Sequence, residues 1–122
     1  MSLTTINLGA PEPMVLARFY ERLLGWTVDE DSADETWVVV RPPQPGVAIS
    51  CQLEEAHVAP VWPALEGDQQ MQLHLEVGVD DLNGALEHAL ASGAELAQYQ
   101  PQDDVRVCLD PAGHPFCLWL RE

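Results

Sequence analysis

The amino-acid sequence repeats one order of elements in its two halves, and this repeat constrains the fold more than any other feature. Equivalent positions in residues 5–53 and 71–120 lie 66 to 68 residues apart. Each half begins with a short strand-like stretch, Ile6-Asn7-Leu8 in one and Leu73-His74-Leu75 in the other, and then enters a segment with helical periodicity. The sequence therefore predicts two copies of one structural unit.

Both predicted helices carry their apolar side chains on one face. These side chains recur at i, i+3, i+4, i+7 and i+8, as Leu16, Phe19, Tyr20, Leu23 and Leu24 and as Leu82, Ala85, Leu86, Ala89 and Leu90. Pro13 suits a first helical turn, and Asp80 or Asp81 suits an N-cap. Gly25 and Gly93 each follow the last apolar helical residue, where a left-handed cap is common.

Three strands are predicted after each helix, so that each half has the order βαβββ. Their expected ranges are 26–30, 36–41 and 47–53, then 95–99, 105–109 and 115–120. The connection over residues 54–70 contains Pro60, Pro63 and Gly67 and is long for a compact domain. We expect one α+β domain spanning 1–122, with a first module over 4–53, a bridge over 54–70 and a second module over 71–122.

Strand alternation separates an apolar face from a polar face in both modules. The apolar faces are expected to carry the helices. The predicted polar face holds Asn7, Ser50, Gln52, Gln72, His74, Glu76, Arg106, Cys117 and Trp119. A flat face exposed to solvent would show the same alternation, but Cys117 and Trp119 favour partial cover because such side chains are usually at least partly buried.

The charge of the chain limits its partners. Twenty acidic residues against five basic ones give a net charge of −15, which repels nucleic-acid phosphates and anionic lipids. A cationic small molecule remains a candidate ligand, although a solvated acidic surface is the simpler interpretation. The sequence has no membrane-spanning apolar run and no signal-peptide pattern, so we expect a cytoplasmic protein. Three cysteines without CxxC spacing indicate reduced thiols.

The stretch Asp110–Trp119, DPAGHPFCLW, is a tight turn that leads into the last predicted strand. With the paired βαβββ modules, Gly25 and Gly93, it resembles the vicinal oxygen chelate superfamily, which groups glyoxalase I, extradiol dioxygenases and the bleomycin and fosfomycin resistance proteins. The resemblance implies curved mixed sheets around a cup-shaped cavity, with helices on the outer face. A small glyoxalase-like branch is indicated by Cys51-Gln52, Pro60–Pro63 and Leu73–Glu76.

In metal-dependent members of that superfamily, the first and last strands of each module hold the metal, usually through His or Gln paired with Glu. Carried over residue by residue, these positions fall on Asn7, on Ser50 or its neighbour Gln52, on His74 and on Cys117. Only His74 suits a divalent oxygenase or lyase site, which requires imidazole with anionic oxygen. His74 with Cys117, or Glu76 nearby, offers zinc ligands but not three well-spaced ones. We therefore expect no catalytic metal, with a divalent metal at His74 as the alternative.

The resemblance implies two alternative functions. In the first, the protein binds a small organic ligand without the usual metal, as drug-sequestering relatives do in an aromatic-lined cleft, and Trp37, Trp62 and Trp119 would supply the stacking surfaces. In the second, it is an enzyme, either metal-dependent or with His74 as general base. Substrate-positioning residues for that enzyme would be Gln52, Gln72 and Arg106. Two-module relatives commonly dimerise, so we also expect a homodimer.

Overall fold

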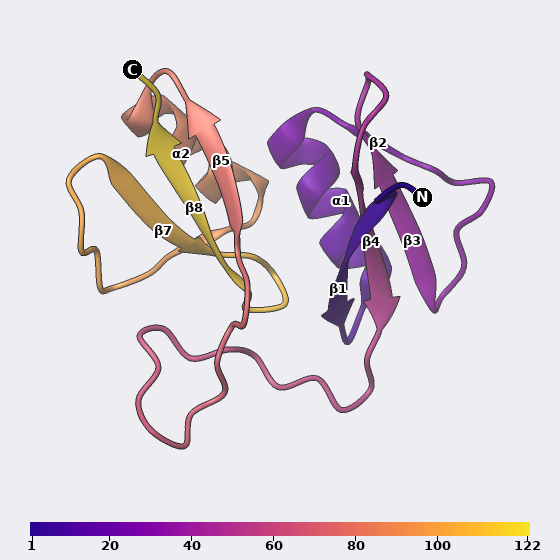
Figure 1. The fold of residues 1–122 in the computed structure, drawn as a ribbon, viewed down its shortest axis with the longest axis horizontal. Helices are drawn as coiled ribbons and strands as arrows, with labels where there is room; N and C mark the ends of the chain where they lie inside the picture. The colour runs from indigo at the N-terminus through magenta and orange to yellow at the C-terminus, as the bar shows by residue number, and fades with distance from the viewer. The chain divides into compact units, whose positions relative to one another are not determined.

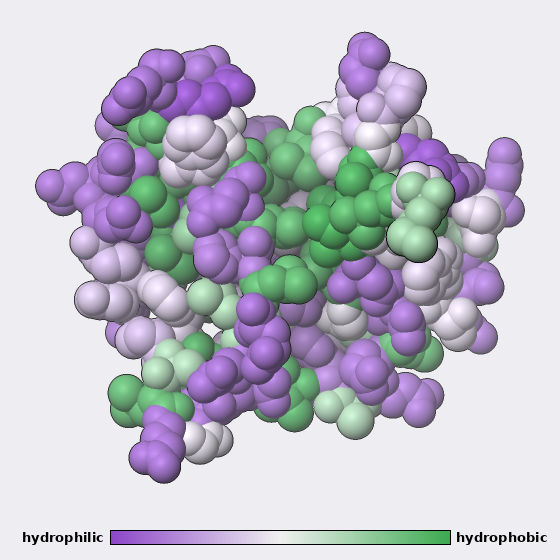
Figure 2. Space-filling model, viewed as in Figure 1, coloured by the Kyte–Doolittle hydropathy of each residue, from purple (hydrophilic) through white to green (hydrophobic).

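A computed structural model describes residues 1–122 as two compact units, a first unit over Met1–His57 and a second unit over Val58–Glu122. Each unit contains one helix and one four-stranded mixed sheet in the order βαβββ (Figure 1). The α+β class and the predicted repeat are therefore confirmed. Hydrophilic residues are spread over both units on the face shown in Figure 2, as the net charge of −15 leads one to expect.

The first unit is a sheet with the strand order β1-β4-β3-β2. Its elements are β1 (Thr5–Ala10), α1 (Pro13–Leu24), β2 (Thr27–Val28), β3 (Trp37–Arg41) and β4 (Ala48–Leu53). Strands β1 and β4 are parallel and place Asn7 opposite Ser50, whereas the other pairs are antiparallel. Helix α1 packs on this sheet.

The second unit repeats this topology with the order β5-β8-β7-β6. Its elements are β5 (Leu75–Val79), α2 (Leu82–Ser92), β6 (Glu95–Leu96), β7 (Val105–Leu109) and β8 (Pro115–Leu120). The parallel pair β5–β8 places Glu76 opposite Cys117, and β7 pairs antiparallel with both β8 and β6. Strands β7 and β8 have the predicted bounds.

Both helices begin and end where the sequence predicts. Pro13 opens α1, and Gly25 ends it with a φ of 71°, a left-handed conformation that glycine adopts without steric cost. In α2, Asp81 is the N-cap and its carboxylate accepts the backbone N–H of Gly84 at 3.1 Å. Gly93 follows with a φ of 120°. Neither helix is long and apolar enough to cross a membrane.

The two helices bury their apolar faces to different extents. In α1, Leu16, Phe19 and Tyr20 are fully buried, and each such side chain contributes about 1.5–3 kcal/mol to stability. In α2, only Ala89 and Ser92 are buried. Leu90, which the periodicity places on the apolar face, is 43% exposed, so the predicted face of α2 is only partly covered.

Strand β6 is shorter than the predicted range 95–99. It pairs with β7 only at Glu95 and Leu96. Beyond them the N–H of Ala97 still donates to the Val107 carbonyl at 3.0 Å, but Gln100 bonds the other two backbone groups: its Oε1 accepts the Val107 N–H and its Nε2 donates to the Ala97 carbonyl, both at 2.8 Å. A side chain thus satisfies backbone groups that a longer β6 would have paired.

Strand β5 begins at Leu75, so His74 lies one residue before the strand rather than within it. The chain bends just ahead of this point. Gln72 has a φ of 60°, and the N–H of Leu73 donates to the Met71 carbonyl at 2.6 Å. The predicted strand-like stretch at 73–75 is therefore wrong for its first two residues, because the chain bends at residues 72 and 73 and the strand begins only at Leu75.

The prediction that Arg106 shares the polar face of the sheet with Cys117 is also wrong. The β7–β8 register pairs Val107 with Cys117 and Arg106 with Leu118, and residues directly opposite each other share a face of the sheet. Arg106 therefore lies on the face of Leu118, which is buried. Its guanidinium donates to the carbonyl oxygens of Asp103 and Val105.

Candidate functional site

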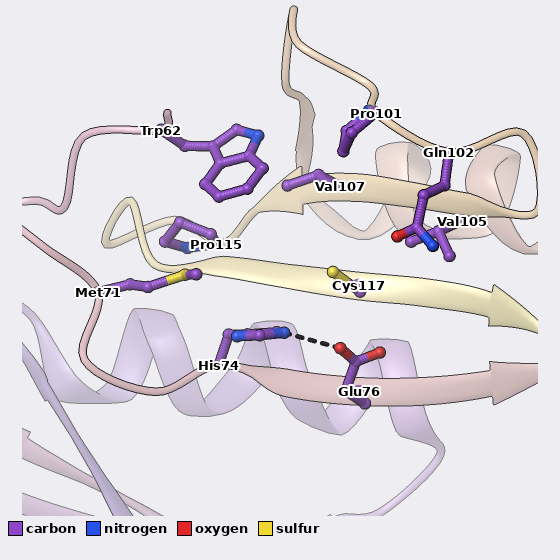
Figure 3. A pocket seen from close by; sticks show the side chains of 10 residues that line it. All are labelled: Trp62, Met71, His74, Glu76, Pro101, Gln102, Val105, Val107, Pro115 and Cys117. Atoms are coloured by element: carbon purple, nitrogen blue, oxygen red, sulfur yellow. Dashed lines mark hydrogen bonds and ion pairs between the residues drawn. The ribbon is translucent and has the colours of Figure 1, made fainter. Parts of the chain in front are cut away.

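The second unit contains a pocket of about 370 Å³ over the face of β5, β7 and β8 that carries Cys117. This volume lies within the range of about 300–1,000 Å³ that is usual for small-molecule sites. The lining residues, all drawn in Figure 3, are Trp62, Met71, His74, Glu76, Pro101, Gln102, Val105, Val107, Pro115 and Cys117. The pocket thus combines strand residues with residues of the loops before β5 and β7.

Three polar side chains form one cluster in this pocket. Nε2 of His74 lies 2.7 Å from Oε1 of Glu76, and the Glu76 side chain is about half exposed. Glu76 stands opposite Cys117 in the β5–β8 pair. The ligand atoms of His74, Glu76 and Cys117 all lie within 4.8 Å of one another, so the fold brings together an imidazole, a carboxylate and a thiol.

The Cys117 thiol is not an activated nucleophile. Burial, and then the negative charge of Glu76, raises the pKa of Cys117 to about 11. Reactive cysteines instead have lowered pKa values, beside cations or at helix N-termini. At neutral pH Cys117 is therefore a thiol, and nucleophilic catalysis at this position is disfavoured.

The apolar part of the pocket is built around Trp62. Its indole N–H donates to the Tyr99 carbonyl at 3.1 Å, and the two rings are tilted by 35° with centroids 6.1 Å apart. In Figure 3, Trp62, Met71 and Pro115 gather at one end of the pocket, and Gln102 lies at the other. The hydrogen bond fixes the edge of the indole and leaves a planar surface for an organic ligand.

The predicted site residues of the first unit form their own groups. Nδ2 of Asn7 donates to Oγ of Ser50 at 2.8 Å, and Ser50 is fully buried. Trp37 and Gln52 stand opposite each other in the β3–β4 pair. They line a more open cavity of about 390 Å³ together with Thr36, Leu53, Glu54 and Glu55.

Three of the predicted ligand-binding residues that belong to the second unit do not line its pocket. Gln72 occupies the turn before β5, and Arg106 lies on the opposite face of the sheet. Trp119 shares the face of Cys117 but stands opposite Gly78, and it is 39% exposed. The pocket therefore uses His74, Glu76, Cys117 and Trp62 from the predicted set.

The sequence analysis missed several lining residues, namely Met71, Pro101, Gln102, Val105, Val107 and Pro115. A signal for the two valines was present. The turn between β7 and β8 pairs Leu109 with Pro115, and counting back from that pair places Val107 opposite Cys117. Met71, Pro101 and Gln102 lie in loops, where strand alternation gives no prediction.

The residues do not fit the usual metal set of the superfamily. Asn7 and Ser50 are hydrogen-bonded to each other, and neither supplies the anionic oxygen that such a site requires. The strand pairing also corrects which residues of the two modules are equivalent, because the sequence analysis matched Asn7 with His74. Asn7 faces Ser50 and Glu76 faces Cys117, so the counterpart of Asn7 is Glu76, and the match to His74 is wrong by two residues.

Comparison with known proteins identifies the family. The sequence model of the glyoxalase-like domain family matches residues 4–119. A glyoxalase/bleomycin resistance protein/dioxygenase family enzyme from Burkholderia phytofirmans PsJN has a TM-score of 0.71 at 16% identity, with 98% of each chain covered. A glyoxalase-related enzyme from Fulvimarina pelagi has a TM-score of 0.65 at 19% identity, covering 99% of this chain and 88% of the other.

An antibiotic-binding protein from a Streptomyces species, TnmS3, is also similar in structure. Its TM-score is 0.59 at 15% identity, with 100% of this chain and 97% of the other covered. No curated protein matches the chain in sequence. At these identities the solved structures show a shared fold, and the family model covers nearly the whole chain. The protein therefore belongs to the glyoxalase-like domain family of the vicinal oxygen chelate superfamily.

Proposed function

We propose that the protein binds a small aromatic cation in the pocket of the second unit, without the superfamily's usual metal. The observation that carries this proposal is the combination of an indole surface at Trp62 with the Glu76 carboxylate in one cavity of about 370 Å³. An aromatic ring gains from stacking on the indole, and a cation gains from both the indole face and the carboxylate. TnmS3, which shares the fold, is described as an antibiotic-binding protein.

The charge of the protein supports a cationic ligand. The net charge is −15, and a negative potential concentrates cations near the surface and speeds their association. Glu76 provides the local charge inside the pocket, and its hydrogen bond to His74 orients the carboxylate. Met71, Val107 and Pro115 supply apolar surface around it. The proposal thus assigns orientation to Glu76 and most of the contact area to the apolar residues.

Calorimetric titration with proflavine, a planar aromatic cation, tests this function. We expect saturable binding of one proflavine per chain, and weaker binding of the anion 9-anthracenecarboxylate, which offers a similar ring system with the opposite charge. Trp62→Ala should weaken proflavine binding by about fivefold or more, since base–aromatic stacking is worth about 1–3 kcal/mol. Equal binding of both probes would contradict the proposal.

A matched pair of variants separates the pocket from general charge attraction. Glu76→Gln and Glu66→Gln each remove one negative charge, but Glu66 is exposed and does not line the pocket. We expect only Glu76→Gln to weaken proflavine binding substantially. Equal effects of the two variants would mean that the net charge attracts the dye without a defined site.

A metal-dependent enzyme that uses His74 remains the second candidate function. The observation in its favour is the cluster of three ligand atoms from His74, Glu76 and Cys117.

We also propose the homodimer expected from the sequence, and sedimentation equilibrium at micromolar concentration tests it. A monomer at that concentration would contradict the dimer.

A further inference from the structure

We propose that the pocket of the second unit selects ligands whose cation is a planar amidinium or guanidinium group, recognised by Glu76 and Gln102 together. This inference rests on the proposed function, because it assigns the class of cation that the same pocket binds. An amidinium spreads its positive charge over two nitrogen atoms, whose N–H groups donate hydrogen bonds in one plane. A quaternary ammonium carries the same charge and donates none, so the two classes can be distinguished by experiment.

Gln102 is the one lining residue with a side-chain amide, and no group of the protein forms a hydrogen bond with that amide. Gln100, two residues earlier in the loop between β6 and β7, differs in this respect. Its Oε1 accepts the N–H of Val107, and its Nε2 donates to the Ala97 carbonyl, both at 2.8 Å. One glutamine therefore fixes the loop, while the other keeps its oxygen and its N–H groups for a ligand.

The loop that carries Gln102 is anchored on both sides of this residue. Before it, the loop is held by its other glutamine, which bonds β7. After it, the Asp103 carbonyl accepts a hydrogen bond from the Arg106 guanidinium at 3.0 Å, and the Asp104 carbonyl accepts the N–H of Leu120 at 2.9 Å. A backbone held in this way loses little entropy when the side chain binds a ligand, which favours affinity.

Glu76 supplies the negative charge from the other side of the pocket. Its Oε1 lies 2.7 Å from Nε2 of His74, its Oε2 accepts no hydrogen bond from the protein, and the side chain is about half exposed. In Figure 3, Glu76 extends into the pocket from β5 and Gln102 from the loop before β7, with Cys117 between them on β8. Burial and the charge of Glu76 raise the pKa of Cys117 to about 11, so this thiol is neutral. One negative charge suits a monovalent cation.

These two acceptors select the shape of the cation. N–H groups at the two edges of an amidinium can donate to the Glu76 carboxylate and to the Gln102 oxygen at the same time. The flat faces of the amidinium can contact Val105 and Val107, which line the pocket. A quaternary ammonium satisfies neither acceptor, yet it still displaces water from the carboxylate, which costs free energy. With stacking on Trp62, the ligand class is therefore aryl amidines and aryl guanidines.

Calorimetric titration with two cations of equal charge tests the inference. Benzamidine and phenyltrimethylammonium each join one phenyl ring to one positive charge, but only benzamidine donates hydrogen bonds. We expect the wild-type protein to bind benzamidine at least about tenfold more tightly than phenyltrimethylammonium, because hydrogen bonds to charged groups are the stronger ones. Benzamidine should also displace proflavine. Equal affinities, a preference for phenyltrimethylammonium, or failure of both cations to bind would overturn the inference.

A matched pair of variants assigns the preference to Gln102. Gln102→Leu removes the amide from the pocket, whereas Gln98→Leu removes an exposed amide of the same loop that does not line the pocket. We expect Gln102→Leu to lower the ratio of the two affinities by about fivefold or more, since only benzamidine loses an acceptor, and Gln98→Leu to leave the ratio unchanged. Gln102→Met, which keeps the side-chain length, should behave like Gln102→Leu. An unchanged ratio in folded Gln102 variants, checked by circular dichroism, would overturn the assignment.

The selectivity for amidinium and the proposed function can fail separately. Proflavine binding without a preference for benzamidine would keep the aromatic-cation function and remove the amidinium selectivity. A preference for benzamidine without proflavine binding would keep recognition by Glu76 and Gln102 and remove stacking on Trp62. If none of the three cations binds, both proposals are wrong.

Discussion

Replacing Asp110 with alanine should destabilise the second unit, because this carboxylate holds the turn that precedes β8. The Asp110 side chain is completely buried. Its Oδ1 accepts the backbone N–H of Ala112 at 2.9 Å and that of His114 at 3.0 Å, and its Oδ2 lies 2.9 Å from Nδ1 of His114. Asp110→Ala removes every one of these acceptors and leaves the donors in the turn.

The expected loss of stability depends on whether water can reach each N–H group that loses the carboxylate. A buried donor left unpaired costs about 1–3 kcal/mol. Ala112 is buried, so water has little access to replace the carboxylate that its N–H loses, whereas His114 is partly exposed and water can replace part of its loss. The total for Asp110→Ala is about 3 kcal/mol. Asp110→Asn keeps one oxygen for the two backbone N–H groups and loses the contact with the imidazole, which should cost about 1 kcal/mol.

Urea unfolding followed by circular dichroism measures these losses. With a slope of about 1–2 kcal/mol per molar urea, Asp110→Ala should lower the midpoint of the second unit's transition by about 1.5–3 M. Asp103→Ala, at an exposed aspartate before β7, is the control and should change the midpoint little. The reasoning is refuted if Asp110→Ala is within about 0.5 kcal/mol of the wild type, or if the asparagine and alanine variants are equally unstable.

Three further predictions concern Cys117, Gly113 and Asn7. Because the pKa of Cys117 is raised to about 11, the thiolate is scarce below that value, and alkylation by iodoacetamide should rise about tenfold per pH unit without levelling off near pH 9; peptide mass spectrometry measures the rate. Gly113→Ala should lower stability by more than about 1 kcal/mol in thermal denaturation, since φ is 87° and the new Cβ would lie 2.6 Å from a loop side chain. Asn7→Ala should cost about 1 kcal/mol by removing the 2.8 Å bond to buried Ser50, and adding Ser50→Ala should restore part of that loss in the same assay.

The sequence predicted those parts of the fold that depend on local backbone restrictions. Pro13 and Gly25 bound α1 because one fixes φ and the other adopts a left-handed conformation. Asp81 caps α2 with its own carboxylate. The turn at residues 110–114 likewise determines where β7 ends and β8 begins. In each case the residue type itself carries the information.

The remaining features depend on contacts between distant residues. Strand β6 stops early because the Gln100 side chain bonds Val107, and no local pattern predicts that exchange. Arg106 lies on the opposite face because the whole register of β7 follows its pairing with β8. Trp62 and Met71 reach the pocket from a connection without periodicity. The sequence therefore predicted the polar cluster of His74, Glu76 and Cys117 better than the other residues that line the pocket.

The repeat gives the two units one pair of equivalent positions with different chemistry. In the first unit, the pair is Asn7 and Ser50, whose amide and hydroxyl satisfy each other in a 2.8 Å hydrogen bond. In the second unit, the pair is Glu76 and Cys117, a carboxylate beside a thiol, and the carboxylate bonds His74 instead. The first pair is closed and stabilises its sheet, whereas the Glu76 carboxylate stands beside a neutral thiol and is about half exposed, so a ligand in the pocket can reach it. The same backbone position thus serves structure in one unit and is suited to a ligand in the other.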